Sequence, residues 1–241
     1  MRSLLRADAI VLLRSRVSAF LSILLPIVIL VATTLGKAET RFGGPGALIG
    51  LALTLGLITS CLLGYSLTLA HDREVGVLQR LRVSPAPTWT IMTSRLCVQV
   101  AANLIASIVV VIVGAILHGL TLGTWQYALV LAIAILGAAV FLAIGQALVG
   151  LVQSTSAINA IGRILFIILV LLGLLGETGI LGDTVKSIAG RSPVGALMSL
   201  FSDVLNQTAW SDQDTYSLLA CVGYVIVFAF VGIRWFRWDA R

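Results

Sequence analysis

The stretch LCVQVAANLIASIVVVIVGAILHGLTLGTWQYALVLAIAILGAAVFLAIGQALVGLVQSTSAINAIG, residues 96–162, contains 67 consecutive residues without Asp, Glu, Lys or Arg. A helix needs roughly 20 apolar residues to cross a bilayer, so this stretch is long enough for two crossings. A glycine-rich turn, HGLTLGT at 118–124, divides it into two halves. Backbone polar groups inside a bilayer must bond to one another, so each half is predicted to be a helix.

Three shorter charge-free stretches flank the long one, at 17–36, 42–71 and 215–233. The chain of 241 residues is 59% hydrophobic and 11% charged, and its mean hydropathy is +1.07. A soluble domain of this length cannot bury so much apolar surface, so the composition excludes most classes of soluble protein. The sequence predicts an all-α membrane protein with a single transmembrane domain, 1–241. Its six predicted spans lie near 17–36, 46–70, 96–117, 126–152, 158–178 and 216–234.

The lysines and arginines are unevenly distributed between the two sides that six spans define. Twelve of the 16 fall on the side that holds both termini, the loop 71–95 and Arg163, and four fall on the side of the external loop 177–215. Positive charge collects on the cytoplasmic side of a membrane, so we expect both termini in the cytoplasm of a multi-pass protein of the bacterial inner membrane. The net charge of +6 follows from this bias, and no basic cluster with interleaved aromatic residues indicates a nucleic-acid partner.

Several residue patterns that carry chemistry are absent from the sequence. It has no G-x-x-x-x-G-K-[ST] phosphate loop, since Gly36-Lys37 is followed by Ala38, and its two histidines form no zinc pattern. The predicted spans contain no Asp, whereas ion-coupled carriers usually place ionisable groups near the bilayer midplane. These absences argue against self-powered secondary transport, so we expect a chain that is not an enzyme, binds no metal or cofactor of its own, and depends on an energy source outside itself. An intramembrane enzyme and a passive channel or assembly scaffold are the alternatives.

The loop after the second predicted span begins HDREVGVLQRLRVSPAP, residues 71–87. Asp72 to Val83 is predicted to form a short helix, because its acids fall in the first turn, its arginines fall late and Pro85 stops it. A rigid, charged helix at the mouth of a bundle suits docking to a cytoplasmic partner. A solvated connector that carries the positive charge of the cytoplasmic side is the alternative.

The order of residues in this loop resembles that of the type 2 ABC-exporter permeases, which export drugs, lipids and polysaccharides. The family pattern is an acid, a glycine and then Leu-x-[Lys/Arg]-Leu-Arg-x-[Ser/Thr]-Pro. The matching positions here are Glu74, Gly76, Leu78, Arg80, Leu81, Arg82, Ser84 and Pro85. Leu4 to Gly36 resembles the N-terminal connecting helix and first span of the family, and Ser192-Pro193 resembles the start of its external segment, so the resemblance covers nearly the whole chain.

The resemblance implies that this chain has no ATPase site and that ATP and Mg bind to a separate cytoplasmic ABC ATPase subunit, present in two copies. It also implies that two permease halves pair in the membrane lipid, the second half being a copy or a paralogue. The loop helix would pass the movement of the ATPase to the spans. Its polar rim would be Glu74, Arg80 and Arg82, and Leu78 and Leu81 would fill the ATPase groove. The apolar spans suit export of a hydrophobic or amphipathic cargo, a drug or a lipid.

Small and polar residues predict where the spans approach one another closely. One set indicates either the seam between two permease halves or packing within one bundle: Gly46, Gly50, Thr54, Cys61 and Gly64. A second set indicates either a substrate pathway or hydrogen bonds between helices: Gln99, Asn103, Phe141 and Gln146.

An apolar stripe follows Ser192 in the predicted external loop. Ser192 is placed to cap a helix, Pro193 falls in its first turn, and the stripe includes Leu197 and Phe201. We expect this external helix to lie on the outer leaflet or dip into it, either as a gate over an exit path or as a cover for the bundle.

Overall fold

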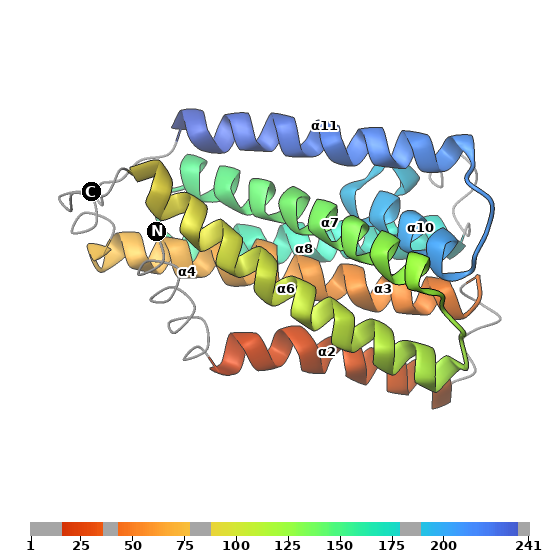
Figure 1. Ribbon diagram of the computed structural model, residues 1–241. Coiled ribbons are helices and arrows are strands. Elements are labelled where there is room, and N and C mark those ends of the chain that lie inside the picture. Colours follow the sequence, from red (N-terminus) through yellow and green to blue (C-terminus); the bar gives the residue numbers. More distant parts are fainter. Residues whose placement is uncertain (1–15, 36–42, 78–87, 179–188, 236–241) are drawn as a thin grey trace.

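A computed structural model describes residues 16–35, 43–77, 88–178 and 189–235. Within these ranges every regular element is helical, which confirms the predicted all-α class. The elements along the chain are α2 (Arg16–Leu35), α3 (Pro45–Leu57), the π-helix η2 (Ile58–Gly64), α4 (Tyr65–Glu74), α6 (Thr88–His118), α7 (Thr124–Leu151), α8 (Thr155–Thr178), α10 (Pro193–Leu205) and α11 (Asp212–Trp235). The long helices lie side by side along one direction (Figure 1).

The two ends of the bundle differ in which connections they hold. At one end, here called the proximal end, α2 begins, α4 and α7 end, and α11 ends (Figure 1). The opposite, distal end holds the turn between α6 and α7 and the connection between α10 and α11. The first and last described residues, Arg16 and Trp235, therefore lie at the same end of the molecule.

Five helices of the described residues are long and apolar enough to cross a membrane. They are Pro45–Glu74, Thr90–His118, Thr124–Leu151, Thr155–Leu174 and Asp212–Trp235. The first of them joins α3, η2 and α4 into one continuous helix of 30 residues. The 20-residue helix α2 covers the first predicted span and contains Pro26.

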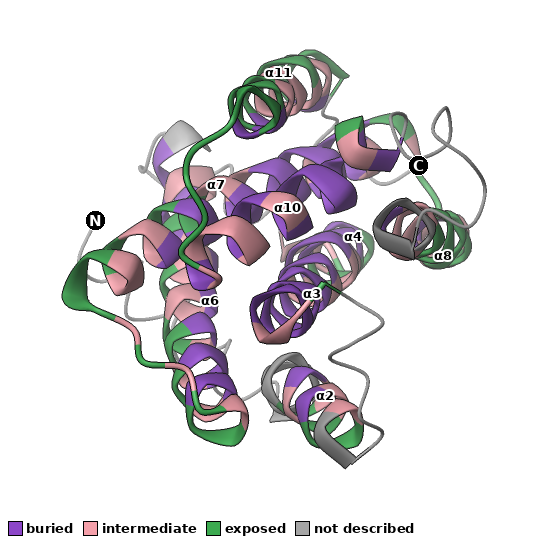
Figure 2. Cartoon of the chain, turned by 90° about the vertical axis from the view of Figure 1, so that its right-hand side faces the viewer, coloured by how far each residue is buried: buried purple, intermediate pink, exposed green. Residues whose placement is uncertain are grey.

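The α3–η2–α4 helix forms the centre of the bundle. In its most apolar stretch 83% of the residues are buried, against 17% in α8 and in α11. Figure 2 shows α3 with α2, α6, α7, α8 and α10 arranged around it, while α11 lies outside α7 and α10. The outer faces of α8 and α11 therefore present apolar side chains to the surroundings, as lipid-facing helices do.

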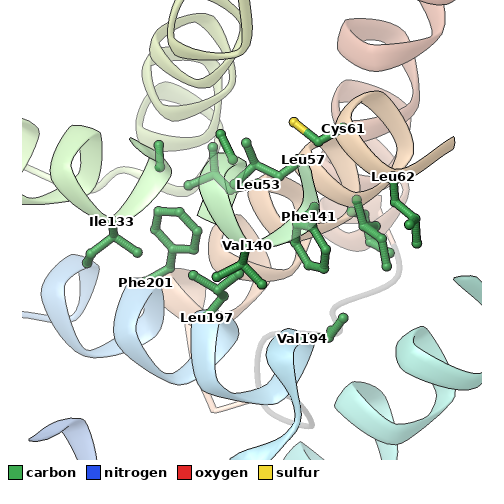
Figure 3. Close-up of a cluster of buried hydrophobic side chains, with 14 of the residues drawn as sticks. Leu53, Leu57, Cys61, Leu62, Ile133, Val140, Phe141, Val194, Leu197 and Phe201 are labelled. Atoms are coloured by element: carbon green, nitrogen blue, oxygen red, sulfur yellow. The ribbon is translucent and has the colours of Figure 1, made fainter. Parts of the chain in front are cut away.

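The core between the central helix, α7 and α10 is built from interlocking apolar side chains (Figure 3). Phe141 of α7 is fully buried, and it lies among Leu57, Leu62 and Leu197 of the facing helices. A Cβ at Gly137 would come within 2.9 Å of Leu57 and 3.2 Å of Leu197, so the missing side chain is what lets the three helices approach.

The helix α10 is inserted among the spans and does not lie on the surface. Nine of its 13 residues are buried, and it packs against α3, α7, α8 and α11. Its start follows the predicted pattern, because Ser192 Oγ accepts a hydrogen bond from the Gly195 N–H at 3.1 Å and Pro193 occupies the first turn. The sequence identified its apolar stripe, but side chains outside the stripe, such as Leu200, are buried as well.

Candidate functional site

The second span extends further toward the following loop than the charged residues at its end predicted. It ends at Glu74, and the helix predicted to begin at Asp72 is wrong at its start, because Asp72 and Glu74 belong to the last turn of α4. The Val75 N–H donates to the His71 carbonyl at 2.9 Å, and the Gly76 N–H donates to the Arg73 carbonyl at 3.2 Å. Gly76 then turns the chain with a φ of +76°, a left-handed conformation that glycine adopts at little cost.

The predicted coupling loop is therefore shorter than 71–95. Helix α4 ends at Glu74 and α6 begins at Thr88, so 13 residues, 75–87, connect them. Glu74 and Val75 are exposed at the point where the chain leaves the bundle. The other proposed ATPase-contacting residues lie outside the described part of the chain: Leu78, Arg80, Leu81, Arg82 and Pro85.

Arg73 fixes the last turn of α4 to the end of α7. Its side chain is only 2% exposed, and its guanidinium donates to three backbone carbonyls, those of Val149 at 2.8 Å, Val152 at 2.9 Å and Gln153 at 2.7 Å. The last carbonyls of a helix have no partner within the helix and carry its negative dipole end. The guanidinium, with five N–H donors in a planar fork, satisfies the Val149 carbonyl in the last turn of α7 together with the carbonyls of Val152 and Gln153 just beyond the helix, and it gains from the dipole.

The end of α7 shows why this contact is needed. The capping residue Val152 has an extended conformation, with φ −110° and ψ +133°, and no glycine terminates the helix. The next helix begins at Thr155, so the chain has no room for a longer turn that could fold back on these carbonyls. Sequence analysis counted Arg73 only as positive charge, because its partners are backbone atoms that no side-chain pattern reveals.

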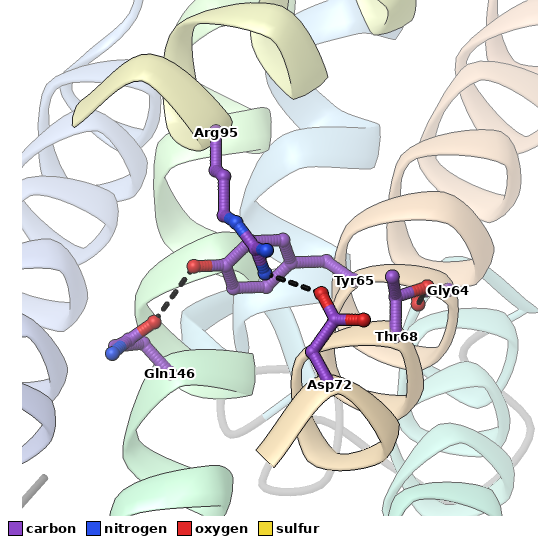
Figure 4. A network of polar contacts seen from close by, with 6 residues as sticks. All are labelled: Gly64, Tyr65, Thr68, Asp72, Arg95 and Gln146. Carbon is purple, nitrogen blue, oxygen red and sulfur yellow. Dashed lines mark hydrogen bonds and ion pairs between the residues drawn. The ribbon is translucent and has the colours of Figure 1, made fainter. Parts of the chain in front are cut away.

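A second contact joins α4 to the start of α6. Arg95 Nη1 lies 2.6 Å from Asp72 Oδ2, and both side chains are largely covered, being 15% and 21% exposed (Figure 4). One to two turns further into the bundle the Tyr65 hydroxyl donates to Gln146 Oε1 of α7 at 2.8 Å. The inner part of the second span is thus bonded to both α6 and α7 through side chains about two turns apart.

Polar side chains of α6 bind the π-helical segment η2 in the middle of the same span. Gln99 Nε2 donates to Ser60 Oγ at 2.8 Å, and Asn103 Nδ2 donates to Cys61 Sγ at 3.2 Å. A Cβ at Gly145 of α7 would lie 3.1 Å from the Cys61 carbonyl oxygen, so α7 also approaches the π-helical backbone closely. Short π-helical segments occur frequently at functional sites.

The four residues considered for a substrate pathway instead join helices within this chain. Gln99, Asn103 and Gln146 make the hydrogen bonds just described, and Phe141 is fully buried in the core. The packing beside Asn103 leaves a cavity of about 10 Å³, which is room for one water molecule at most. In this conformation the four residues therefore lie at contacts between helices of the described chain.

The small residues of the second span also pack within the bundle. The Gly46 N–H donates to Asn206 Oδ1 at 3.0 Å, and a Cβ at Gly50 would meet Phe201 Cβ at 3.0 Å. Thr54 and Cys61 are fully buried. These contacts lie within the same chain, with Gly46 and Gly50 against α10 and its C-cap and Cys61 against α6 and α7. Gly64 is less covered, and a Cβ there would meet only the Thr59 carbonyl oxygen, at 3.6 Å.

Residues 1–204 match the family model of the ABC-2 type transporter, and the chain therefore belongs to this family. It is a transmembrane subunit of an ABC transporter, and in this family the ATPase activity generally resides in a separate subunit. A comparison with curated proteins gave no match.

Proposed function

We propose that this chain is one permease half of an ATP-driven exporter in the bacterial inner membrane, driven by a separate cytoplasmic ABC ATPase. The observation that carries the proposal is the hydrogen bonding of Arg73. The residue that precedes Glu74 and the coupling loop is tied to three carbonyls at the end of α7, and its neighbour Asp72 is tied to Arg95 of α6. A displacement applied to the loop between Gly76 and Thr88 would reach two further spans directly.

The mechanical path continues into the middle of the second span. Because α4 is bonded to α6 and α7 at its proximal end, these three segments would move as one body when the ATPase subunits close. The π-helical turn at Ile58–Gly64 separates this body from the outer half of the span, which packs on α10. The proposed movement would therefore shift the proximal half of the bundle relative to the α10 region at the distal end.

In the proposal, export requires a second permease half. The packing beside Asn103 leaves room for one water at most, and in the proposal cargo moves along a surface between two halves. Helix α8 exposes apolar side chains at helical spacing, Ile164, Ile167, Ile168 and Leu171, and this face can meet a copy or a paralogue. Two halves would bind two ATPase subunits, and the apolar surfaces suit a drug or a lipid as cargo.

The proposed topology has six spans and cytoplasmic termini. Helix α2, the first span in the chain, is added to the five long apolar helices to give six. The proximal end, with Arg73, faces the cytoplasm. In a cysteine-free chain in whole cells, a cysteine replacing Thr208 at the exposed distal end should react with a membrane-impermeant maleimide. A cysteine replacing Glu74 should react only after the membrane is opened, and the reverse pattern would overturn the orientation.

The ATPase partnership is tested by purifying the tagged full chain from its own membrane. We expect an ABC ATPase to co-purify, and Glu74→Arg to reduce its recovery because that side chain lies exposed beside the loop. His71→Ala, on the same exposed turn but further from the loop, is the control. Absence of any ATPase from the wild-type preparation, or ATP-independent flux through liposomes holding the chain alone, would remove the proposed function.

A further inference from the structure

A groove of about 550 Å³ runs along one flank of α11, beside the segment that precedes α10. Residues of α11 spaced by three and four positions line it: Tyr216, Ala220, Gly223, Tyr224, Val227 and Phe228. Its lining is almost entirely apolar apart from Arg191, which stands just before α10. From Tyr216 to Phe228 the groove covers 12 residues of helix, about 18 Å at 1.5 Å per residue.

A hydrogen bond to its backbone carbonyl holds Arg191 beside this groove. The Tyr224 hydroxyl donates to the Arg191 carbonyl at 3.0 Å, which joins the segment before α10 to the middle of α11. The side chain of Arg191 is exposed, and no acidic residue of the described chain forms an ion pair with it. The groove thus combines one available guanidinium with aromatic and aliphatic walls.

The position of the groove limits what can occupy it. Only 17% of the most apolar stretch of α11 is buried, so its free face meets the hydrocarbon of the membrane. The length of about 18 Å is close to the thickness of one leaflet's hydrocarbon, about 15 Å. A guanidinium binds phosphate oxygens through paired hydrogen bonds, and the bond is strengthened where water is scarce.

We propose that this groove binds an anionic phospholipid of the surrounding membrane. Its phosphate would contact Arg191, and one acyl chain would lie along α11 over Gly223 toward Phe228. The lipid would be a resident component of the fold that fills the space between α11 and the start of α10. The site is separate from the contacts of Arg73 and Asp72, so it does not depend on the proposed coupling to an ATPase.

Gly223 offers a way to close the groove without disturbing the fold. A Cβ built at this position has no atom within 4 Å, so a larger side chain extends into open space. Gly223→Leu would occupy the volume of an acyl chain and would also favour the helical conformation. Val222→Leu adds bulk to an exposed neighbour that does not line the groove, and it is the matched control.

The test uses the full chain reconstituted in vesicles of phosphatidylcholine and phosphatidylglycerol in equal amounts, extracted in mild detergent and weighed with its bound lipids by native mass spectrometry. The wild type should retain phosphatidylglycerol in preference to phosphatidylcholine. Arg191→Gln should weaken retention of phosphatidylglycerol about tenfold, equivalent to about 1.4 kcal/mol, and should weaken that of phosphatidylcholine less, because the choline cation already offsets the charge of its phosphate. Gly223→Leu should lose both lipids, while Val222→Leu should behave as the wild type.

Arg234→Gln removes an exposed cation from the other end of α11 and controls for non-specific attraction of the lipid. Equal losses in Arg234→Gln and Arg191→Gln, or equal retention in every variant, would overturn the proposal. A further arm adds ATP to the chain purified with its ATPase. Release of phosphatidylglycerol from the wild type on ATP turnover would identify the occupant as cargo and would contradict a resident lipid.

Discussion

Arg73 Nη1 lies 2.8 Å from the carbonyl oxygen of Val149, so a charged side chain at the end of the second span closes the end of α7. A cation is stabilised at the negative end of a helix dipole, and burial strengthens that interaction. An arginine keeps its proton in proteins, so the guanidinium is a permanent cation here although the side chain is only 2% exposed. The two spans are joined by a contact that is strong, directional and located one residue before Glu74.

Removal of the Arg73 guanidinium should destabilise the chain markedly. Arg73→Met keeps the length of the side chain but removes the donor from the buried Val149 carbonyl and from the partly buried carbonyls of Val152 and Gln153, which we expect to lower the free energy of unfolding by about 2–4 kcal/mol. Arg73→Lys should lower the free energy of unfolding by a smaller amount, because an ammonium group keeps the charge but cannot reach all three oxygens. Thermal unfolding in detergent, followed by tryptophan fluorescence, measures the change. Arg163→Met, at an exposed arginine of α8, should have little effect, and an equal loss there would contradict the assignment.

The left-handed conformation of Gly76 gives a prediction about coupling. Gly76→Ala should strain the turn by about 1–2 kcal/mol and change the direction in which the loop leaves α4, so ATP-dependent transport should fall while insertion is retained. Gly76→Asn should be milder, because Asn tolerates this conformation. Gly119, with a φ of +65° in the distal turn, provides the control. Gly119→Ala introduces similar strain far from the loop, and a matching loss of transport would show that strain alone is responsible.

The contact between α3 and α10 should be sensitive to a single methyl group. A Cβ at Gly50 would lie 3.0 Å from Phe201 Cβ and 3.2 Å from the Met198 carbonyl oxygen, so Gly50→Ala must push the two helices apart. We expect a loss of about 1–3 kcal/mol in the free energy of unfolding. Gly223→Ala, which meets no atom within 4 Å, should be neutral or slightly stabilising. Similar melting temperatures for the two variants would refute the close packing.

The distal end should respond to pH through Asp203. Burial is the largest cause that raises the pKa of Asp203 to about 6 from an ordinary 3.8. The protonated Asp203 carboxyl can also donate a hydrogen bond to Asp214, and the negative charge of Asp214 acts in the same direction, while Thr208 and Ser199 donate hydrogen bonds that oppose the shift. The folded chain therefore binds this proton more tightly than the unfolded chain does. The resulting stabilisation is complete below about pH 4 and is lost as the pH rises through 6.

Melting temperatures at pH 5 and pH 7.5 should show this loss, which we expect to be about 1–2 kcal/mol because solvent partly screens the carboxyl group. Asp203→Asn mimics the protonated side chain and should flatten the pH dependence over this interval. Asp212→Asn, at an exposed carboxylate in the first turn of α11, should leave it unchanged. A pH profile of Asp203→Asn that follows the wild type would exclude Asp203 as the titrating group.

The helices were predictable because the membrane demands long apolar stretches, but their ends were not. The sequence ended the second span near residue 70, before Asp72 and Arg73, because charged side chains are costly in a bilayer. Both charges lie inside the helix because Arg95 and the carbonyls of α7 provide partners. Those partners are 23 and 76 residues away in the chain, and no local pattern indicates them.

The polar residues of the spans illustrate the same limit. Gln99 and Asn103 were identified correctly as unusual, and both alternatives for them, a pathway or helix contacts, were consistent with the sequence. Their partners Ser60 and Cys61 lie in a π-helical segment, which the periodicity of apolar residues does not reveal in a stretch that is apolar on every side. The insertion of α10 among the spans was likewise hidden, because its apolar stripe also suits a helix on a membrane surface.

The capping of α7 by Arg73 also sets an order of events during biosynthesis. The ribosome delivers the second span well before it delivers Val149 to Gln153, so in the nascent chain the guanidinium has none of its final acceptors. Until those residues emerge, the arginine has to remain hydrated at the membrane boundary and the second span cannot settle to its full depth. Truncation of the chain before Val149 would therefore leave this span displaced toward the aqueous phase.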